Sequence, residues 1–372
     1  MKLTAIQRDR AAGVLLATAA GDALGAPFEF GPPQPQTVPV EMTGGGAWDA
    51  GEWTDDTAMA VAIAEVAAEG FDLRSAEAQN RIVARWYEWS RGAKDVGIQT
   101  RAVLSATGVA GSASTARSQA EALHQRTGRT GGNGSIMRTA PVALAYLDDK
   151  AGLIEAATSL STLTHFDPEA AEACALWCLA IRHAVLTGEL DVRVGLGTLD
   201  ADRAEAWRAR IDVAEVSTPA DFEHNGWVVE AFQAAWCAIA TTPIPTDDPA
   251  GGMFRADHLR LALQAAVRGG RDADTVAAIA GGLLGAVHGA SAVPWSWRRL
   301  LHGWPGIEAH DLVNLTGRIE RGGAPDRFDF TYQRYPHVGV LARHPYDDDV
   351  LLGGVAGLSD LPSDVDAVVS LC

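Results

Sequence analysis

The sequence predicts an all-α protein. Ala, Leu and Val recur at helical spacing along most of the chain, and Gly, Pro, Asp and Thr separate these stretches. No convincing alternation of polar and apolar residues, which would indicate strands, occurs in the first 320 residues. We expect one helical domain whose chemistry lies on loops at helix ends. The predicted helices cover residues 4–25, 57–69, 75–92, 98–107, 115–125, 138–148, 151–162, 168–187, 200–216, 227–240, 256–268 and 275–288.

The composition is typical of a soluble globular chain. Its 372 residues are 47% hydrophobic, which is enough to bury a sizeable core. No uninterrupted apolar run reaches the roughly 18 residues of a membrane helix, and the first ten residues lack a signal-peptide core. We therefore expect a cytoplasmic protein that does not contact a membrane. The net charge of −17 disfavours a large nucleic-acid interface. The four cysteines, Cys174, Cys178, Cys237 and Cys372, are too few for a disulfide scaffold. Cys174 and Cys178 lie one helical turn apart and are either a pair of soft-metal ligands or buried thiols, and the lack of a His or Cys partner at matching spacing favours buried thiols.

Two acidic helix starts stand out. The first, Thr54-Asp55-Asp56-Thr57, lies between a glycine-rich loop and the apolar helix 57–69. Asp and Thr are good N-caps and suit the positive end of a helix dipole, which accounts for one or two of these residues. Adjacent carboxylates repel each other unless a cation lies between them, and oxygen ligands suit Mg²⁺ or Mn²⁺. Taken alone, the run fits a capped helix start and half of a metal site equally well.

The second acidic start, Asp272-Ala273-Asp274-Thr275, repeats this pattern before the apolar helix 275–288. Alternate aspartates can point at one ion where the backbone turns into a helix. The small residues behind both starts would let the two helices lie close together, which would bring their carboxylates to one place. Two matched clusters favour the metal interpretation.

Two further acidic residues lie in loops. Glu29 stands between Phe28 and Phe30, just after Gly25 and Pro27 end the first helix. It is either a partly exposed loop residue or a carboxylate whose basicity is tuned by an apolar pocket. Asp95 precedes Val96-Gly97 and can equally be the N-cap of the helix 98–107.

Two later loops complete the set of candidates. The segment from Gly131 to Ser135 is rich in glycine and precedes the predicted helix 138–148. It is either a plain turn or an anion cradle of backbone amides, and it lacks the Lys-Ser/Thr ending of a P-loop. Asp167 and Pro168 predict the start of the helix 168–187, and His165 before them would by itself be structural more often than functional.

Taken together and in order, these motifs resemble the ADP-ribosylglycohydrolase family, which includes the dinitrogenase-reductase-activating glycohydrolase and the ADP-ribosyl-arginine and ADP-ribosyl-serine hydrolases. The motifs that carry the resemblance are Gly21-Asp22 with Gly25 and Glu29, Trp53-Thr54-Asp55-Asp56-Thr57, Asp95-Val96-Gly97, Gly132-Asn133-Gly134-Ser135-Ile136-Met137-Arg138, Thr164-His165 and Asp272-Ala273-Asp274-Thr275. With the flanking helices they cover most of residues 1–322.

The resemblance implies an orthogonal multi-helix bundle with two divalent metal ions, Mg²⁺ or Mn²⁺, in a cleft. It implies that Glu29 activates water or binds metal and that Asp95 lies close to the scissile ribose. The implied substrate-binding residues are Gly132, Asn133, Gly134, Ser135 and His165. The implied metal ligands are Thr54, Asp55, Asp56, Asp272, Asp274 and Thr275. Ala273 departs from many relatives, which carry Thr, Ser or Cys there, and alanine can only affect the site indirectly.

The resemblance thus implies a metal-dependent hydrolase that cleaves the glycosidic bond between ADP-ribose and an acceptor, with arginine as the first choice of linkage. Its partner would be an ADP-ribosylated protein or small molecule, and nucleic acid would enter only as an ADP-ribosylated substrate. The alternative is a non-catalytic relative that binds ADP-ribose or serves a structural role. A metallophosphohydrolase would need more His or basic residues near the carboxylates than the sequence has.

Residues 323–372 fall outside the resemblance. The runs 350–354 and 365–372 are strand-like and are bounded by turn residues. They are faintly similar to the start of dual-specificity phosphatases, but no Cys-x5-Arg loop is present, so no phosphatase activity follows. We expect either the beginning of a second domain or an extension that packs on the helical domain.

Overall fold

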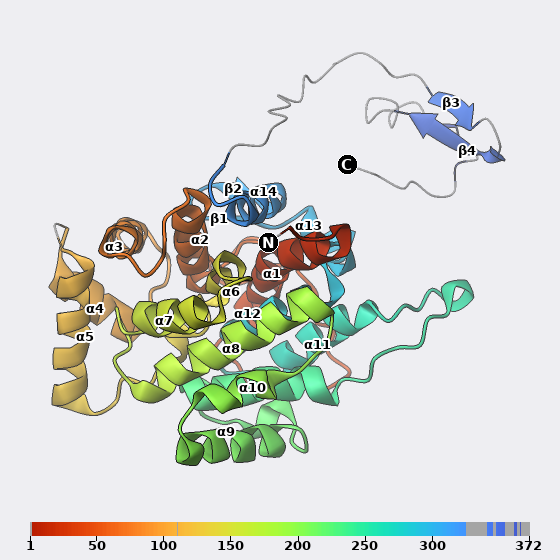
Figure 1. Cartoon of the computed structure of the whole chain (residues 1–372). Coiled ribbons are helices and arrows are strands. Elements are labelled where there is room, and N and C mark those ends of the chain that lie inside the picture. The colour runs from red at the N-terminus through yellow and green to blue at the C-terminus, as the bar shows by residue number, and fades with distance from the viewer. Residues whose placement is uncertain are drawn as a thin grey trace. The chain divides into compact units, whose positions relative to one another are not determined.

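The computed structural model describes residues 2–109, 111–324, 341–344, 347–353, 361–362 and 365. The contacts between Cα atoms divide the chain into two units, Met1–Ala324 and Pro325–Cys372. The first unit is built from helices with short connections, so the predicted all-α class is confirmed (Figure 1). The domain division at residue 322 stays a prediction, because a boundary in contacts does not show that either part folds by itself.

The helices follow the predicted ranges closely over most of the chain. They are α1 (Ala5–Gly25), α2 (Asp55–Ala68), α3 (Ala76–Ser90), α4 (Ile98–Thr107), α5 (Ala113–Thr127), α6 (Ala140–Ala145), α7 (Lys150–Ser161), α8 (Pro168–Thr187), α9 (Ala201–Ala214), α10 (Val228–Thr241), α11 (Asp257–Arg268), α12 (Ala273–His288), α13 (Trp295–Arg298) and α14 (Ala309–Glu320). Short 3₁₀ turns stand between some of them, including η1 (Ala26–Phe28) and η2 (Asn133–Ser135).

The sequence prediction is wrong at three places in this unit. The predicted helix 138–148 is only α6, since Pro141 suits the first turn of a helix and would break a helix that began earlier. The helices α13 and α14 were not predicted, although α14 buries Leu312, Leu315 and Ile319 at helical spacing and begins with a capping box. A short antiparallel pair, β1 (His302–Gly303) and β2 (Ile307–Glu308), was also missed.

In the second unit, β3 (Leu341–His344) pairs antiparallel with β4 (Asp347–Gly353), so the strand predicted at 350–354 is present but begins earlier. The other predicted strand, 365–372, lies outside the described residues except for Val365.

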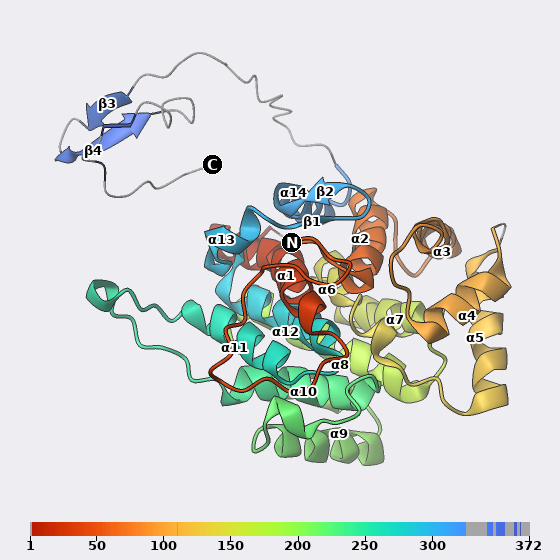
Figure 2. The same ribbon diagram turned by 180° about the vertical axis from the view of Figure 1, so that it is seen from behind.

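Two segments, Ala5–Phe28 and Pro168–Thr187, are long and apolar enough to cross a membrane by length and composition, contrary to the sequence expectation. Inside the structure, however, 83% and 72% of their most apolar windows are buried. Helices that are apolar on all sides are typical of the centre of a large core as well. Figures 1 and 2 show α1 at the centre of the helical unit, with α8 beside α12.

The centre of the helical unit is the antiparallel pair of α1 and α12, which have the most extensive contact of any two elements described. Their backbones approach so closely that glycine is required at the contact. A Cβ atom added to Gly21, Gly281 or Gly25 would lie 2.1, 2.1 or 2.4 Å from backbone atoms of Ala277, Ala17 and Asp274, respectively. The pairing puts the end of α1 beside the start of α12.

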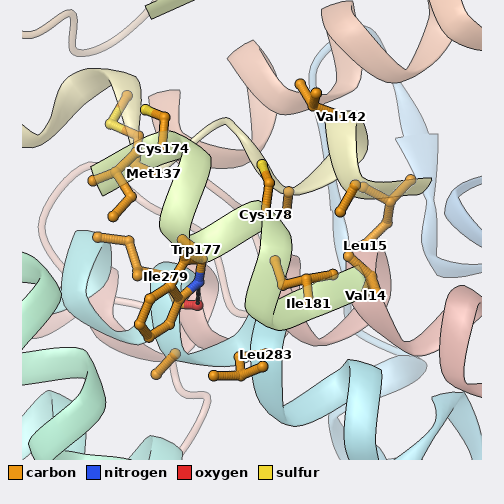
Figure 3. Close-up of a cluster of buried hydrophobic side chains, with 14 of the residues drawn as sticks. Val14, Leu15, Met137, Val142, Cys174, Trp177, Cys178, Ile181, Ile279 and Leu283 are labelled. Carbon is orange, nitrogen blue, oxygen red and sulfur yellow. Dashed lines mark hydrogen bonds between the residues drawn. The ribbon is translucent and has the colours of Figure 1, made fainter. Parts of the chain in front are cut away.

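Side chains from α8 close the core over α12 (Figure 3). The indole N–H of Trp177 donates a hydrogen bond to the carbonyl of Ile279 over 3.0 Å, which ties α8 to α12. Cys174 and Cys178 are free and buried, as predicted, and Cys237 is also free and buried, while Cys372 lies outside the described residues. Asp167 caps α8 and Pro168 follows it, as predicted.

The glycine contact gives a direct test of this packing. We expect Gly281→Ala to destabilise the protein by about 1–3 kcal/mol, because the added methyl group must push the α1 and α12 backbones apart. As a matched control, Gly317→Ala inside α14 meets only the mobile end of the Arg321 side chain and should raise stability by up to about 1 kcal/mol. Chemical denaturation of both variants would measure this, and equal stability of the two would contradict the packing argument.

Candidate active site

The end of α1 and the starts of α2 and α12 meet in a cluster of carboxylates. Oxygens of Asp22, Asp56 and Asp274 all lie within 4.8 Å of one another, and the three side chains are buried. A second group with the same spacing joins Glu29, Asp272 and Asp274. Asp274 belongs to both groups, so the carboxylates form one continuous site.

Asp22 attaches α2 to this site. Its carboxylate accepts hydrogen bonds from the backbone N–H of Thr54 and of Thr57, both at 2.9 Å, and from the Thr57 hydroxyl at 2.6 Å. The two acidic helix starts meet as predicted, since α2 contacts α12 and Asp56 lies in one group with Asp274, but α12 packs far more extensively on α1 than on α2. Asp22 connects α2 to α1 from inside the core.

The start of α2 presents its two aspartates differently. The Thr54 hydroxyl donates to Oδ2 of Asp56 over 2.9 Å, and Oδ1 of Asp56 is buried without a hydrogen-bond partner among the described residues. Asp55 is partly exposed and accepts a long hydrogen bond of 3.3 Å from the backbone of Gly97. Gly97 is the N-cap of α4, so the alternative that Asp95 caps this helix is wrong. Asp95 is partly exposed.

A short backbone pairing holds Glu29 beside α12. Phe30 N–H donates to the carbonyl of Arg271 over 2.5 Å, and Arg271 N–H donates to the carbonyl of Gly31 over 2.7 Å. Phe30 and Arg271 both adopt the left-handed conformation, with φ of 59° and 61°. Glu29 precedes this bridge and Asp272 follows it, which explains why their carboxylates meet.

The glycine-rich loop borders the other side of Asp272. The side-chain amide of Asn133 donates to Oδ2 of Asp272 over 2.8 Å and to the carbonyl of Asn225 over 2.9 Å. Asn225 in turn accepts from the backbone N–H of Asp272 over 3.1 Å. The loop continues into η2 and not into a long helix, so its N–H groups are not those of a helix terminus.

A cavity of about 490 Å³ begins at this loop. It is lined by Gly131, Gly132, Gly226 and the half-exposed Trp227, together with Gly128, Arg129, Asp167 and Glu169. A Cβ atom at Gly226 would lie 3.6 Å from Oδ2 of Asp272, so the cavity adjoins the carboxylates.

His165 lies beneath the loop and is only 2% exposed. A Cβ atom at Gly134 would come within 3.0 Å of its ring, so the ring packs against the loop. Arg138 donates to the Thr164 hydroxyl over 2.6 Å, and that hydroxyl lies 2.7 Å from Nδ1 of His165. Burial and the Arg138 charge hold the pKa of His165 well below its usual range.

Comparison with known proteins decides the family of this chain. A profile described as ADP-ribosylglycohydrolase matches residues 3–325. The chain belongs to the ADP-ribosylglycohydrolase family. As a member of this family, the protein is an enzyme that hydrolyses glycosidic bonds.

Named relatives match over most of the chain. An ADP-ribosylarginine hydrolase of Pseudomonas putida (strain GB-1) is 29% identical over 303 residues, which cover 78% of this chain and 73% of that protein. The ADP-ribosyl-dinitrogen reductase glycohydrolase of Rhodospirillum rubrum is 30% identical over 297 residues, with 78% and 89% covered. A solved structure described as an ADP-ribosylglycohydrolase-related protein complex has a TM-score of 0.63 and 29% identity, and the match covers 86% of this chain and 99% of that one.

The carboxylates of this glycohydrolase lack compensating charge. Burial raises the pKa of Asp22 to about 6, although hydrogen bonds from Thr57 and Thr54 oppose the shift. Burial and the neighbouring carboxylates raise the pKa of Asp55 to about 7 and that of Glu29 to about 8, and they hold those of Asp56 and Asp274 well above their usual range. Among the described residues, no ion pair with Lys or Arg reaches these carboxylates. The site therefore favours a cation.

The structure brings the sequence candidates together to different degrees. Asp56, Asp272, Asp274 and Glu29 share the two oxygen groups, Thr54 supports Asp56, and Thr275 is buried beside Asp272. Asp55 and Asp95 lie at the edge, where their charges act on Glu29. Gly132 lines the cavity, and the side chain of Asn133 binds Asp272. Ser135, within the loop, and His165, beneath it, are buried.

Sequence reasoning missed three residues of the site. Asp22 is the only charged residue in the apolar stretch 11–28, and that isolation was a signal for a buried, hydrogen-bonded carboxylate. Asn225 and Trp227 flank Gly226 just before α10. The sequence predicts only a helix from residue 227, and this pattern gives no sign that the residues before it belong to the site.

The raised pKa values predict how stability depends on pH when metal is absent. The folded carboxyls of Asp22, Asp55 and Glu29 hold protons up to about pH 6–8, whereas the ordinary pKa values of Asp and Glu are 3.8 and 4.5. The folded state therefore binds more protons than the unfolded state does. The contribution of these carboxyls to the free energy of unfolding is greatest below about pH 4 and is lost as the pH rises to about 8. In EDTA, we expect the unfolding temperature to fall by roughly 5 °C or more between pH 5 and pH 8.

Calorimetry across this range, with EDTA and with Mg²⁺ or Mn²⁺, would measure the effect. A bound cation favours the charged carboxylates, so the metal-induced rise in unfolding temperature should be larger at pH 8 than at pH 5. A rise that does not vary with pH would show that the carboxylates are already ionised and compensated in the folded state.

Proposed function

We propose that this glycohydrolase uses divalent metal to release ADP-ribose from an arginine side chain. The observation that supports the proposal most directly is the buried group of Asp22, Asp56 and Asp274, in which Oδ1 of Asp56 has no hydrogen-bond partner among the residues that the structure describes. A buried anionic oxygen without a partner carries a desolvation penalty unless a cation compensates it.

The residues fit Mg²⁺ or Mn²⁺. Carboxylate and hydroxyl oxygens are the donors these hard cations prefer, and the site supplies Asp22, Asp56, Asp272, Asp274 and Glu29 close together. We assign Thr54, Asp55, Asp56, Asp272, Asp274 and Thr275 as the ligand set, as the family resemblance implies, with Asp22 orienting α2 behind them. When bound there, divalent ions would supply Lewis acidity, which orients ribose hydroxyls and lowers the pKa of a water molecule.

The cavity beside the glycine-rich loop suits the rest of ADP-ribose. Gly131 and Gly132 let a diphosphate approach the loop backbone, and the exposed face of Trp227 offers a stacking surface for a planar base. The cavity adjoins Asp272, so a ligand bound in it could place its distal ribose at the carboxylates. Two relatives carry the arginine linkage or an ADP-ribosylated protein in their names, which supports the choice of acceptor.

Glu29 is suited to proton transfer in this reaction. It is partly exposed, lies within the carboxylate group and has a pKa raised to about 8, so near neutral pH it can either hold or accept a proton. Hydrolysis breaks the bond between the ribose anomeric carbon and the guanidinium nitrogen. The hydroxyl of water goes to the carbon, and the proton goes to the leaving guanidine. The surrounding carboxylates stabilise the positive charge that develops on the ribose.

The reaction is tested by incubating the enzyme with ADP-ribosyl-arginine and with serine- and nucleic-acid-linked ADP-ribose, with Mg²⁺, with Mn²⁺ and with EDTA. We expect free ADP-ribose from the arginine linkage only with metal. Asp274→Asn should lower the rate by about 100-fold or more, because it removes an oxygen shared by both groups. Asp49→Asn, at the exposed member of the separate Asp49/Glu52/His302 group, is the matched control and should leave the rate unchanged. Binding of ADP-ribose without release from any linkage would favour the non-catalytic alternative.

The role of Glu29 is tested separately. Glu29→Gln keeps the side-chain volume but removes the proton-transfer group, so we expect kcat to fall by about 10²–10⁴-fold while the affinity for ADP-ribose changes little. Titration calorimetry with ADP-ribose and steady-state kinetics would separate the two effects. Lost affinity with an unchanged kcat would assign Glu29 to binding alone.

A further inference from the structure

We infer that Phe30 and Ile98 form a contact surface for the polypeptide that carries the ADP-ribosylated side chain. This inference rests on the proposed function and narrows its substrate class to macromolecular acceptors. We call the two side chains the Phe30–Ile98 rim. Phe30 directly follows Glu29, and Ile98 follows Asp95 by three residues, so both belong to the segments that carry the partly exposed carboxylates.

The opening of the site can be located from exposure. Asp22, Asp56 and Asp274 are buried, whereas Glu29, Asp55 and Asp95 are partly exposed. Solvent, and therefore the acceptor, reaches the carboxylate group from the side of the exposed members. Phe30 directly follows Glu29 in the chain, and Ile98 follows Gly97, whose N–H donates a hydrogen bond to Asp55.

Phe30 is unusual in its backbone as well as in its exposure. Its side chain is 82% exposed and its φ is 59°, in the left-handed region that favours Gly, Asn or Asp. The backbone bonds to Arg271 and Gly31 hold this conformation but do not involve the phenyl ring. Glycine or asparagine would meet the backbone requirement better, and an exposed ring adds nothing to the core. A strained and exposed aromatic residue beside a catalytic group therefore points to a contact with a ligand.

Ile98 lies at the same opening. It is the first residue of α4 and is 91% exposed. The residue before it, Gly97, donates its N–H to Asp55, and the residue after it, Gln99, donates its side-chain amide to the carbonyls of Thr130 and Thr164. The backbone of Ile98 is thus held between residues bonded to Asp55 and to Thr130, which directly precedes the glycine-rich loop, and its side chain remains outside the core.

The chemistry of the rim fits a polypeptide better than ADP-ribose. Single exposed apolar residues are ordinary, but these two stand at the opening of a site whose other exposed groups are carboxylates. ADP-ribose offers phosphates and hydroxyls, and the cavity with Gly131, Gly132 and Trp227 already suits them. A protein acceptor brings a basic side chain for the carboxylates and apolar neighbours for the rim. Aromatic side chains are enriched at such protein contacts, and a surface this small suits a complex that must dissociate.

The test compares two substrates with the same linkage, an ADP-ribosyl-arginine-modified protein and free ADP-ribosyl-arginine. The variants are Phe30→Asn, which keeps a residue that tolerates the left-handed region, Ile98→Ser and the double variant. We expect the double variant to raise KM for the protein substrate by about tenfold with kcat unchanged, and to leave both constants unchanged for the small substrate. Phe30→Leu should restore part of the KM, because it restores an apolar side chain.

The matched control is Val216→Ser, which alters an exposed apolar residue (86% exposed) that follows α9, outside the site. It should not change either substrate's kinetics. Equal losses on both substrates would mean that Phe30 acts by positioning Glu29, and no loss on either would also overturn the rim. A change in sedimentation coefficient of the double variant would identify the rim as a contact between copies of this chain. If the wild-type enzyme releases ADP-ribose from neither substrate, the proposed function itself fails.

Discussion

The close approach of α1 and α12 is the contact on which the rest of the structure depends. Glycines at Gly13, Gly21 and Gly25 on α1 and at Gly281 and Gly285 on α12 let the two backbones touch. Because the helices are antiparallel, this contact sets the end of one beside the start of the other. The distance between the carboxylates of α1 and those of α12 is therefore fixed by core packing and not by flexible loops. The stability of the core and the geometry of the site cannot be changed independently.

The same arrangement creates an electrostatic problem inside the protein. Several carboxylates are buried close together, and each raises the pKa of its neighbours. The N-terminal ends of α2 and α12 compensate part of the charge, because their free N–H groups and dipoles favour anions. The oxygens of Asp22 accept from N–H and hydroxyl groups at the start of α2, but one oxygen of Asp56 has no partner in the described part of the chain. The fold therefore carries unbalanced negative charge, and cation binding and folding stability are physically linked.

Local features of this protein could be predicted from sequence, and so could the meeting of Asp56 with Asp274, but the packing partner of α12 could not. Helical periodicity and caps act over a few residues, so most helices and the cap at Asp167 were predicted correctly. Asp272 and Asp274 could be predicted as site residues for the same reason, because they stand at the start of α12. The packing of α12 against α1 could not be predicted, because small residues occur on both α1 and α2 and only the packed structure decides between them. Asp22 was missed as a site residue because it lies within an apolar helix and not at a helix start.

Two isolated backbone pairings complete the site in a protein that is otherwise helical. One joins Gly31 to Arg271, and the other joins Gly132 to Trp227. Both use main-chain groups, and each lies next to a side chain of the site. The Gly31–Arg271 pairing lies between Glu29 and Asp272, and the Gly132–Trp227 pairing precedes Asn133, whose amide donates to Asp272. The positions of the carboxylates therefore depend on these loop pairings as well as on the helix ends, so the loops and the helical core form one site.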